Sequence, residues 1–204
     1  MTDLASATGI GQLIRSGKRV DLRRHIPANR DDFVRWYQDP EIAVLLRHDL
    51  RPLTSIQARG YFDSIVLPAS ARNTCWAIHE RQSDRLIGST AVTDIDESTA
   101  TSKFRIVIGE KSDWSKGYGS EATLLVAAEA LTRLGLRKIR LEVFTHNLRA
   151  FRAYQRVGFV ETGRHSEWVP RVRRELHVIE MEMNLLEVPD LPVEGEEREN
   201  APRI

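Results

Sequence analysis

The spacing of apolar residues changes twice along the chain, and these changes restrict the fold more than any other feature. Before residue 74, apolar residues recur at helical intervals, as in DDFVRWYQ and after the capping box TSIQ at residues 54–57. CWAIHE, RLIGSTAVTDI and KFRIVI, between residues 75 and 108, alternate with a period of two. Helical spacing returns at residues 120–134. This order predicts an α+β chain whose middle strands form an antiparallel meander.

Shorter segments on both sides of this meander complete the predicted elements. They are strands at residues 20–23, 137–144, 159–161 and 176–185, and a helix at residues 148–157. In the last strand the apolar residues Val178 and Ile179 are adjacent, which predicts a bulge. The prediction is a three-layer α/β arrangement, with a mixed, mostly antiparallel sheet of six to seven strands flanked by helices.

Length and composition favour one domain with a mobile segment at each end. The chain has 204 residues, of which 41% are hydrophobic, which suits one packed core and falls short of the length at which two domains become usual. Residues 1–18 are small and polar, and residues 188–204 are rich in Pro and Glu. We expect a flexible segment at 1–18, a folded domain at 19–187 and a disordered tail at 188–204.

The charges, histidines and cysteine disfavour several classes of partner. The formal net charge is +1 and the basic residues are scattered, which is not typical of binding to nucleic acid or to a membrane surface. The 6 histidines show no metal-ligand spacing, and the single cysteine, Cys75, lies in a strand-like run typical of core packing. We therefore expect a cytoplasmic protein without metal or disulfide, with a small molecule or peptide as partner.

The sequence SDWSKGYGSEA at residues 112–122 joins a predicted strand to the long helix and carries G-x-G at Gly117 and Gly119. It satisfies the dinucleotide fingerprint G-x-G-x-x-G/A, with Glu142 near the place of a ribose-binding acid. A dinucleotide fold, however, turns at its first glycine directly after a strand and repeats parallel strand-helix pairs, which this chain does not. No G-x-x-x-x-G-K-S/T string is present, which excludes a P-loop. What remains is a glycine-lined helix start whose free amides attract phosphate.

A second block of sequence gives this loop its context. The strand IRLEVF precedes NLRAFRAYQRVGF at residues 147–159, which fits the pattern N-x-x-A-x-x-x-Y-x-x-x-G-F. With the loop and the order of elements, residues 18–186 resemble the GNAT superfamily of acyl-CoA-dependent N-acetyltransferases, and in particular its RimJ/RimL-like branch. The family loop is Q/R-x-x-G-x-G/A, and Trp114 replaces the Gln or Arg, as is common in that branch. The resemblance implies the GNAT fold and acetyl transfer from acetyl-CoA to an amine.

By this resemblance, acetyl-CoA is the co-substrate and three sets of residues bind it. The main chain of Val107, Ile108 and Gly109 aligns the pantetheine arm as an added strand would, and an amide there faces the thioester oxygen. The loop holds the pyrophosphate through Trp114, Ser115, Lys116, Gly117, Tyr118, Gly119 and Ser120. Asn147, which also has the position of a helix N-cap, and Phe151 complete the set.

Tyr154 is the predicted general acid. It lies on one helical face with Ala150 and Val157, a pattern that by itself indicates core packing. In the family, the tyrosine at this place lies beside the coenzyme sulfur. The resemblance therefore implies that Tyr154 protonates the departing thiolate.

The base is less well defined by the sequence. Glu142 lies on the face of its strand opposite Ile139, Leu141 and Val143, which look like core. Family members that acetylate protein N-termini often carry a glutamate at this place, where it draws a proton from the ammonium through water. Two alternatives stay open. Glu142 could instead pair with Arg140 or another arginine, and the base could be water, Glu110 or Glu167.

The sequence leaves the acceptor amine open between a protein N-terminus, a polyamine, an amino sugar and an antibiotic. Candidate acceptor contacts without any motif are Trp36, Tyr37, His165 and Trp168. The alternative function is a non-catalytic acyl-CoA-binding sensor or interaction module on the same fold, which would keep the loop and Asn147 but would not require Tyr154. A homodimer is an expectation from the family alone.

Overall fold

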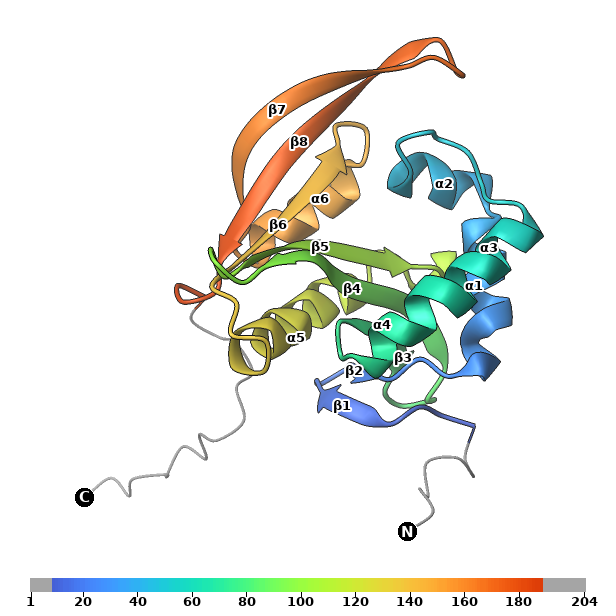
Figure 1. Cartoon of the computed structure of the whole chain (residues 1–204), viewed down its shortest axis with the longest axis vertical. Helices are drawn as coiled ribbons and strands as arrows, with labels where there is room; N and C mark the ends of the chain where they lie inside the picture. The colour runs from blue at the N-terminus through green and yellow to red at the C-terminus, as the bar shows by residue number, and fades with distance from the viewer. Residues whose placement is uncertain (1–8, 189–204) are drawn as a thin grey trace.

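The computed structural model describes residues 9–188, which form one sheet with helices on both faces (Figure 1). Its eight strands lie in the order β1-β2-β3-β4-β5-β6-β8-β7, and every neighbouring pair is antiparallel except β5 and β6. The strands are β1 (Leu13–Ser16), β2 (Val20–Arg23), β3 (Cys75–Glu80), β4 (Leu86–Asp96), β5 (Thr101–Ile108), β6 (Lys138–Phe144), β7 (Val160–Val169) and β8 (Arg174–Asn184). The predicted mixed, mostly antiparallel sheet in an α+β fold is confirmed, with more strands than the six to seven expected.

The helices of the described residues cover the two faces of this sheet. They are α1 (Arg30–Tyr37), α2 (Pro40–Leu46), α3 (Ser55–Tyr61), α4 (Leu67–Ala71), α5 (Tyr118–Thr132) and α6 (Leu148–Arg156), with short 3-10 or π turns η2 (Pro27–Asn29), η3 (Phe62–Val66) and η4 (Lys111–Asp113). The predicted capping box starts α3, because Thr54 and Gln57 each accept a hydrogen bond from the other's backbone amide. None of the described helices has the length and apolar character needed to cross a membrane.

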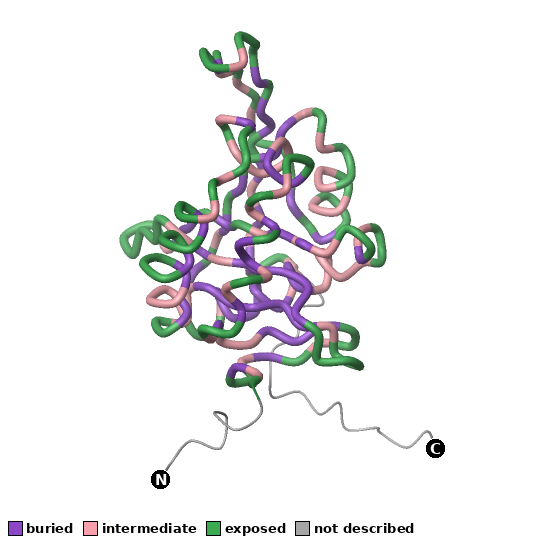
Figure 2. Tube along the Cα trace, turned by 90° about the vertical axis from the view of Figure 1, so that its right-hand side faces the viewer, coloured by how far each residue is buried: buried purple, intermediate pink, exposed green. Residues whose placement is uncertain are grey.

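Alternate residues of the central strands enter two different cores. Trp76 and Ile78 of β3 pack in the main core with α5, whereas Cys75 and Ala77 pack on the side of α1–α4. Figure 2 shows the buried residues concentrated in the middle of the molecule, between these helical layers. The period of two in CWAIHE thus distributes side chains between two buried faces, and no face of this strand is left to solvent.

The prediction of a flexible segment at residues 1–18 is wrong for residues 13–16. These form β1 and pair with β2. Arg15 of β1, which is buried, donates a hydrogen bond from Nε to Glu129 Oε1 of α5 at 2.7 Å, and the pairing makes the burial of both charges tolerable. The sequence could not predict β1, because a four-residue strand is too short to show a periodic pattern and the contact of Arg15 with Glu129 joins residues far apart in the chain. Residues 1–8, and the predicted tail after residue 188, lie outside the described residues.

The bulge predicted in the last strand is also wrong. Val178 and Ile179 keep a regular register with β6 and with β7, and the only irregularity of this strand's described pairings lies in β7, between Glu161 and Gly163, opposite Met181 and Glu180. Both apolar residues are buried because they serve different cores: Ile179 joins the main core, and Val178 joins a cluster with Leu50 and other residues near the β7–β8 hairpin. Two adjacent apolar residues therefore indicate a strand buried on both faces at this point.

The sheet opens between β5 and β6. These parallel strands pair only at Thr101–Lys103 with Lys138–Arg140 and then separate. Each strand is held on its other edge along its whole length, β5 by β4 up to Ile108 and β6 by β8 up to Phe144. The two halves of the sheet diverge because each follows its own antiparallel partner, and this leaves backbone groups of β5 without a partner strand.

Candidate active site

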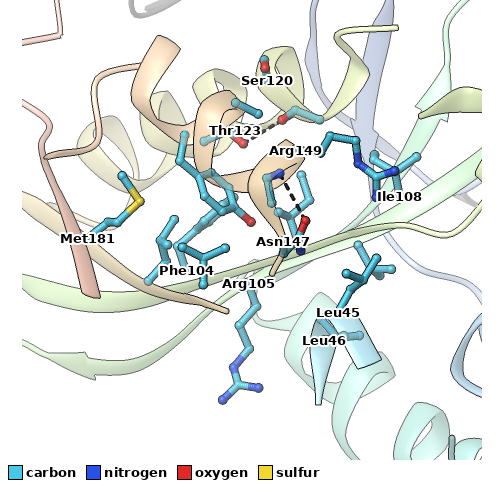
Figure 3. Close-up of a pocket in the computed structure, with 18 of the residues that line it drawn as sticks. Leu45, Leu46, Phe104, Arg105, Ile108, Ser120, Thr123, Asn147, Arg149 and Met181 are labelled. Carbon is cyan, nitrogen blue, oxygen red and sulfur yellow. Dashed lines mark hydrogen bonds between the residues drawn. The ribbon is translucent and has the colours of Figure 1, made fainter. Parts of the chain in front are cut away.

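A cleft of about 720 Å³ fills the space between the separated ends of β5 and β6. It is lined by residues 103–108 of β5, residues 140–144 of β6, the loop before α5 and one face of α6. Figure 3 shows Asn147 and Phe104 on its upper side, with Arg105 extending from β5 to the opposite side. We call this cavity the β5–β6 cleft.

The backbone of β5 presents alternate residues to this cleft. The amide of Gly109 donates to Ile87 O at 2.9 Å, so the main-chain groups of Gly109 and Val107 are directed toward β4. Those of Ile106 and Ile108 are directed toward the cleft, where the indole Nε1 of Trp114 donates to Ile108 O at 2.7 Å. Of the three predicted backbone positions, Ile108 therefore faces the cleft. Ile106 also faces it and was missed, because the sequence does not show whether the odd or the even residues of the strand direct their backbone groups away from β4.

Gly109 has a different reason to be glycine. A Cβ added there would lie 2.0 Å from the ring of Trp36, which is itself almost fully buried. Gly109 therefore makes room for Trp36 and does not line the cleft.

The loop before α5 is shaped to expose backbone amides. Ser115 and Gly117 have positive φ angles of 64° and 84°, and α5 begins directly after them at Tyr118. Such alternation of backbone conformation at a helix start forms a concave set of N–H groups that suits an anion. A Cβ added at Gly119 would meet only Ile108 Cγ1, at 3.6 Å, so packing within the protein does not require glycine there. The open space beside Gly119 faces the cleft and fits the approach of a phosphate group.

The cations at this loop differ from the prediction. Lys116 does not line the cleft, because its Nζ lies 3.0 Å from Asp113 Oδ1. Asp113 is buried and also pairs with Arg85 at 2.8 Å. Burial acts to raise the pKa of Asp113, but hydrogen bonds from Lys116 and Arg85 outweigh it and hold that pKa below its ordinary value. Lys116 thus stabilises the loop through its ion pair with Asp113.

Arg19 and Arg149 are the cations that line the cleft at the loop, and sequence reasoning missed both. Arg19 donates from Nη1 to Lys116 O at 2.9 Å and from Nε to Glu121 at 3.0 Å. The guanidinium of Arg149 lies 3.6 Å from the ring centroid of Trp114, and burial lowers its pKa. Arg149 stands two residues after Asn147 and could have been considered, whereas Arg19 lies far away in the sequence and carries no signal.

Helix α6 brings the predicted amide and phenol to the cleft. Asn147 is the N-cap of α6, with its Oδ1 accepting from the amide of Ala150 at 3.2 Å. Tyr154 also lines the cleft, edge-on to Phe104 and Phe159, and burial raises its pKa to about 12. Within residues 9–188 its hydroxyl makes no hydrogen bond, so it is a neutral donor available to a ligand. Phe151 is not in the cleft but packs against the main core.

Glu142 lies at the other end of the cleft in a row of alternating acids and histidines. His48 Nε2 is 3.4 Å from Glu142 Oε2, and His48 Nδ1 is 2.8 Å from Glu167 Oε2. His165 continues the row, at 3.1 Å from Glu167 and 2.9 Å from Glu180. We call these five residues the Glu–His chain. In the described part of the protein, no three acids or histidines converge as the ligands of one metal ion would.

The Glu–His chain shifts the protonation of its members. The hydrogen bond from His48 lowers the pKa of Glu167, and the hydrogen bond to Glu167 raises the pKa of His165. The alternative partner for Glu142 is not used, because Arg140 pairs with Glu182 at 3.2 Å.

The other acids and aromatics considered in the sequence lie in different places. Glu110 accepts from Arg35 at 2.6 Å and from Trp36 Nε1 at 2.9 Å, outside the cleft. Trp168 is 63% exposed on β7 and Tyr37 lies beyond β5 on the side of α1, so neither lines the cleft. The buried thiol of Cys75, whose pKa burial raises to about 12, is a packing residue.

A comparison with known families identifies the fold. The acetyltransferase (GNAT) domain family matches residues 19–160, which is more than half of the chain. The chain belongs to the GNAT acetyltransferase family. An uncharacterized protein of Methanocaldococcus jannaschii is 24% identical in an alignment 184 residues long, which covers 84% of this chain and 37% of that relative.

Solved structures share the fold at low identity. A GNAT-family acetyltransferase from Bacillus anthracis has a TM-score of 0.73 and 14% identity, covering 86% of this chain and 100% of that one. A spermidine N-acetyltransferase from Vibrio cholerae, in complex with CoA and spermine, has a TM-score of 0.72 and 19% identity, covering 85% of this chain and 100% of that one. At such identities the likeness shows the fold alone.

Proposed function

We propose that this GNAT protein transfers an acetyl group from acetyl-CoA to a primary amine by direct attack in a ternary complex. The observation that carries the proposal is the β5–β6 cleft, in which an open strand edge, an amide-rich helix start and the hydroxyl of Tyr154 face one space. The neutral tyrosine and the carboxylate of Glu142, which both line this space, are what distinguish a catalyst from a simple binding site.

The coenzyme would lie along the open edge of β5. Its pantetheine amides would pair with the main chain of Ile106 and Ile108, as an added strand does. Its pyrophosphate would meet the amides between Ser115 and Ser120, with Arg19 and Arg149 at the rim. Trp114, in place of the usual Gln or Arg, supports placement in the RimJ/RimL-like branch. In this protein it donates to Ile108 O and lies under the guanidinium of Arg149.

The chemistry would need one base and one acid. The amine must lose a proton to attack, and Glu142 would take it directly or through water, with His48 holding the carboxylate in place. The nitrogen then attacks the thioester carbonyl carbon and the C–N bond forms. As the C–S bond breaks, the nitrogen releases its second proton to solvent and becomes the amide. Tyr154 would give its proton to the departing thiolate and regain one from solvent. A pKa of about 12 keeps that proton on the hydroxyl until the thiolate appears.

The experiment that tests this function measures binding and turnover together. Calorimetry with CoA and acetyl-CoA should detect association, and release of free thiol from acetyl-CoA should depend on an added amine. Binding without thiol release across amino acids, peptides, polyamines, amino sugars and aminoglycosides would favour the non-catalytic sensor. Absence of association with either form of the coenzyme would contradict both functions.

A further inference from the structure

A second cavity of about 940 Å³ lies on the opposite side of β5 from the coenzyme loop and α6. Its walls are β4, β5, and the helices α1 and α3, and we call it the α1–α3 cavity. It shares Leu46, His48, Arg105, Ile106 and Val107 with the β5–β6 cleft, so the two spaces adjoin at the middle of β5. A molecule that reaches the thioester from this side would have the α1–α3 cavity beside it.

The cavity carries an excess of positive charge that the protein does not neutralise. Three arginines line it, at positions 47, 72 and 105, against two aspartates, at positions 49 and 94. Arg47 binds Asp49 through two nitrogens at 2.9 and 2.7 Å, and Asp94 pairs with Lys103 at 3.6 Å. Within residues 9–188, Arg72 and Arg105 form no ion pair. The two carboxylates are therefore already occupied, and two guanidinium groups remain.

Arg105 is the one placed at the junction of the two spaces. It alternates with Phe104 and Ile106 along β5, so its side chain leaves the strand on the side of α1 and α3, as Figure 3 shows. Its charge acts to lower the pKa of two phenols there, Tyr37 and Tyr61, although burial is the larger influence and raises both. Tyr37 stacks on Phe33 and Tyr61 lies tilted against both rings, so the two phenols are neutral hydrogen-bond donors that line the same cavity as Arg105.

A guanidinium and phenol donors in one cavity suit a carboxylate, because arginine can bind both of its oxygens and a hydroxyl can donate to the same group. The other boundary of the reacting space is acidic, because Glu142 and Glu180 line the β5–β6 cleft and would face an incoming ammonium. A ligand with a cation at each end would meet Arg105 with like charge, at a cost that a ligand with opposite ends would avoid.

Resting on the proposed function, we propose that the acceptor is a primary amine that also carries a carboxylate, and that Arg105 binds this carboxylate in the α1–α3 cavity. The amine end is directed to the Glu–His chain and the acid end to Arg105. This differs from the polyamine that the Vibrio cholerae neighbour holds, spermine, which has no acid group.

The test compares three acceptors that share one carbon chain: 4-aminobutyrate, 4-aminobutanamide and 1,4-diaminobutane, with shorter and longer homologues because chain length sets the reach. For the best length, kcat/KM for the acid should exceed that for the amide by about tenfold or more, since a hydrogen-bonded ion pair discriminates to that degree. In Arg105→Gln the ratio of acid to amide should fall to about one, and Arg105→Lys should keep part of it. A second arm compares the C-terminally amidated peptides Ala-Glu-Ala-NH2 and Ala-Gln-Ala-NH2, which differ only in the side-chain carboxylate, to tell a free amino acid from an acidic peptide N-terminus as the source of the carboxylate.

The matched control is Arg59→Gln, which removes an exposed arginine of α3 that pairs with Asp31 at 3.1 Å and does not line the cavity. Its acid-to-amide ratio should equal that of the unmodified protein. Two results would overturn the inference without affecting the proposal of acetyl transfer. One is an equal kcat/KM for the acid and the amide. The other is an acid-to-amide ratio that stays unchanged in Arg105→Gln while thermal unfolding shows that the variant is folded. If no amine releases thiol, the proposed function fails, and calorimetry of the acid and the amide in the presence of CoA still decides whether Arg105 binds a carboxylate.

Discussion

The two ends of the β5–β6 cleft are built in different ways. The end that we propose for the coenzyme uses two short sequence blocks, residues 114–120 and 147–154, in which backbone amides and helix starts provide most of the polar groups. The end that we propose for the acceptor gathers single side chains from the loop after α2 and from β5, β6, β7 and β8, among them His48, Arg105 and Glu142. Backbone recognition fixes a constant ligand, whereas isolated side chains can be exchanged one by one to suit a particular acceptor.

The largest effect should come from placing a charge at the coenzyme end. Gly119→Glu adds a carboxylate where the amides are expected to meet phosphate, and an added Cβ there meets only Ile108 Cγ1 at 3.6 Å. We expect CoA affinity to fall by about 100-fold or more, because like charges would meet at a helix start built for an anion. Calorimetry measures the affinity and thermal unfolding checks the fold.

Gly60→Glu is the matched control for this variant, because Gly60 lies on α3 with nothing within 4 Å of an added Cβ. It should leave CoA affinity unchanged. Equal CoA affinity in Gly119→Glu and the unmodified protein would show that the coenzyme does not use this loop, and the contrast between the two ends would then be broken.

A second variant separates chemistry from binding at the coenzyme end. Tyr154→Phe removes a hydroxyl that no described residue holds, and it should lower kcat by about 10² to 10³-fold with little change in CoA affinity, the usual loss for a general acid. Single-turnover measurement of thiol release at several pH values gives the effect. Since burial raises the pKa of Tyr154 to about 12, the unmodified rate should show no loss from tyrosine ionisation between pH 7 and 9. An unaltered kcat in the variant would remove the acid role and leave the binding role of the cleft intact.

The acceptor end can be examined through the Glu–His chain. Glu142→Gln should lower kcat/KM for the amine by about 10²-fold at neutral pH, and His48→Gln by about tenfold, because His48 only positions the carboxylate. The loss of kcat/KM in both variants, relative to the unmodified protein, should become smaller as pH rises, because a larger fraction of the amine is then already neutral. The measurement is a pH-rate profile for each variant. A deficit in Glu142→Gln that stays constant with pH would assign the base to water or to Glu167.

The sequence predicted the helices and strands that depend on a local pattern of residues. The period of two located β3, β4 and β5, the G-x-G loop located the start of α5 to within two residues, and the Asn147 block located α6 with its cap. The sequence could not predict which residues of β5 direct their backbone groups into the cleft. Ile106 and Ile108 differ from Val107 in this respect only through the register of β5 with β4.

The missed residues share another property. Arg19 and His48 reach the site through contacts with residues distant in the chain, as when His48 meets Glu142 and Glu167 across three elements. Arg105 reaches it through the register of β5 with β4. No short motif encodes such contacts. Arginine is usually exposed and histidine often partly exposed, so a single one in a loop or strand is not singled out by the sequence.

The smallest effect should be a titration at the outer end of the Glu–His chain. Hydrogen bonding to Glu167 raises the folded-state pKa of His165, so the stabilisation from this contact is fully present below the ordinary histidine pKa and is lost as pH rises through the raised value. Hydrogen bonding from His48 lowers the pKa of Glu167, so that contribution is present above the ordinary glutamate pKa and is lost as pH falls through the lowered value. Both contributions to stability are present together in mildly acidic solution, so the part of the β7–β8 hairpin that holds His165 and Glu167 should be most stable there. NMR titration of the His165 ring should give a pKa above that of a free histidine, and Glu167→Gln should move it downward. A His165 pKa that Glu167→Gln leaves in place would mean that the chain is not formed in solution, and Glu142 would then lose the support that His48 is proposed to give it.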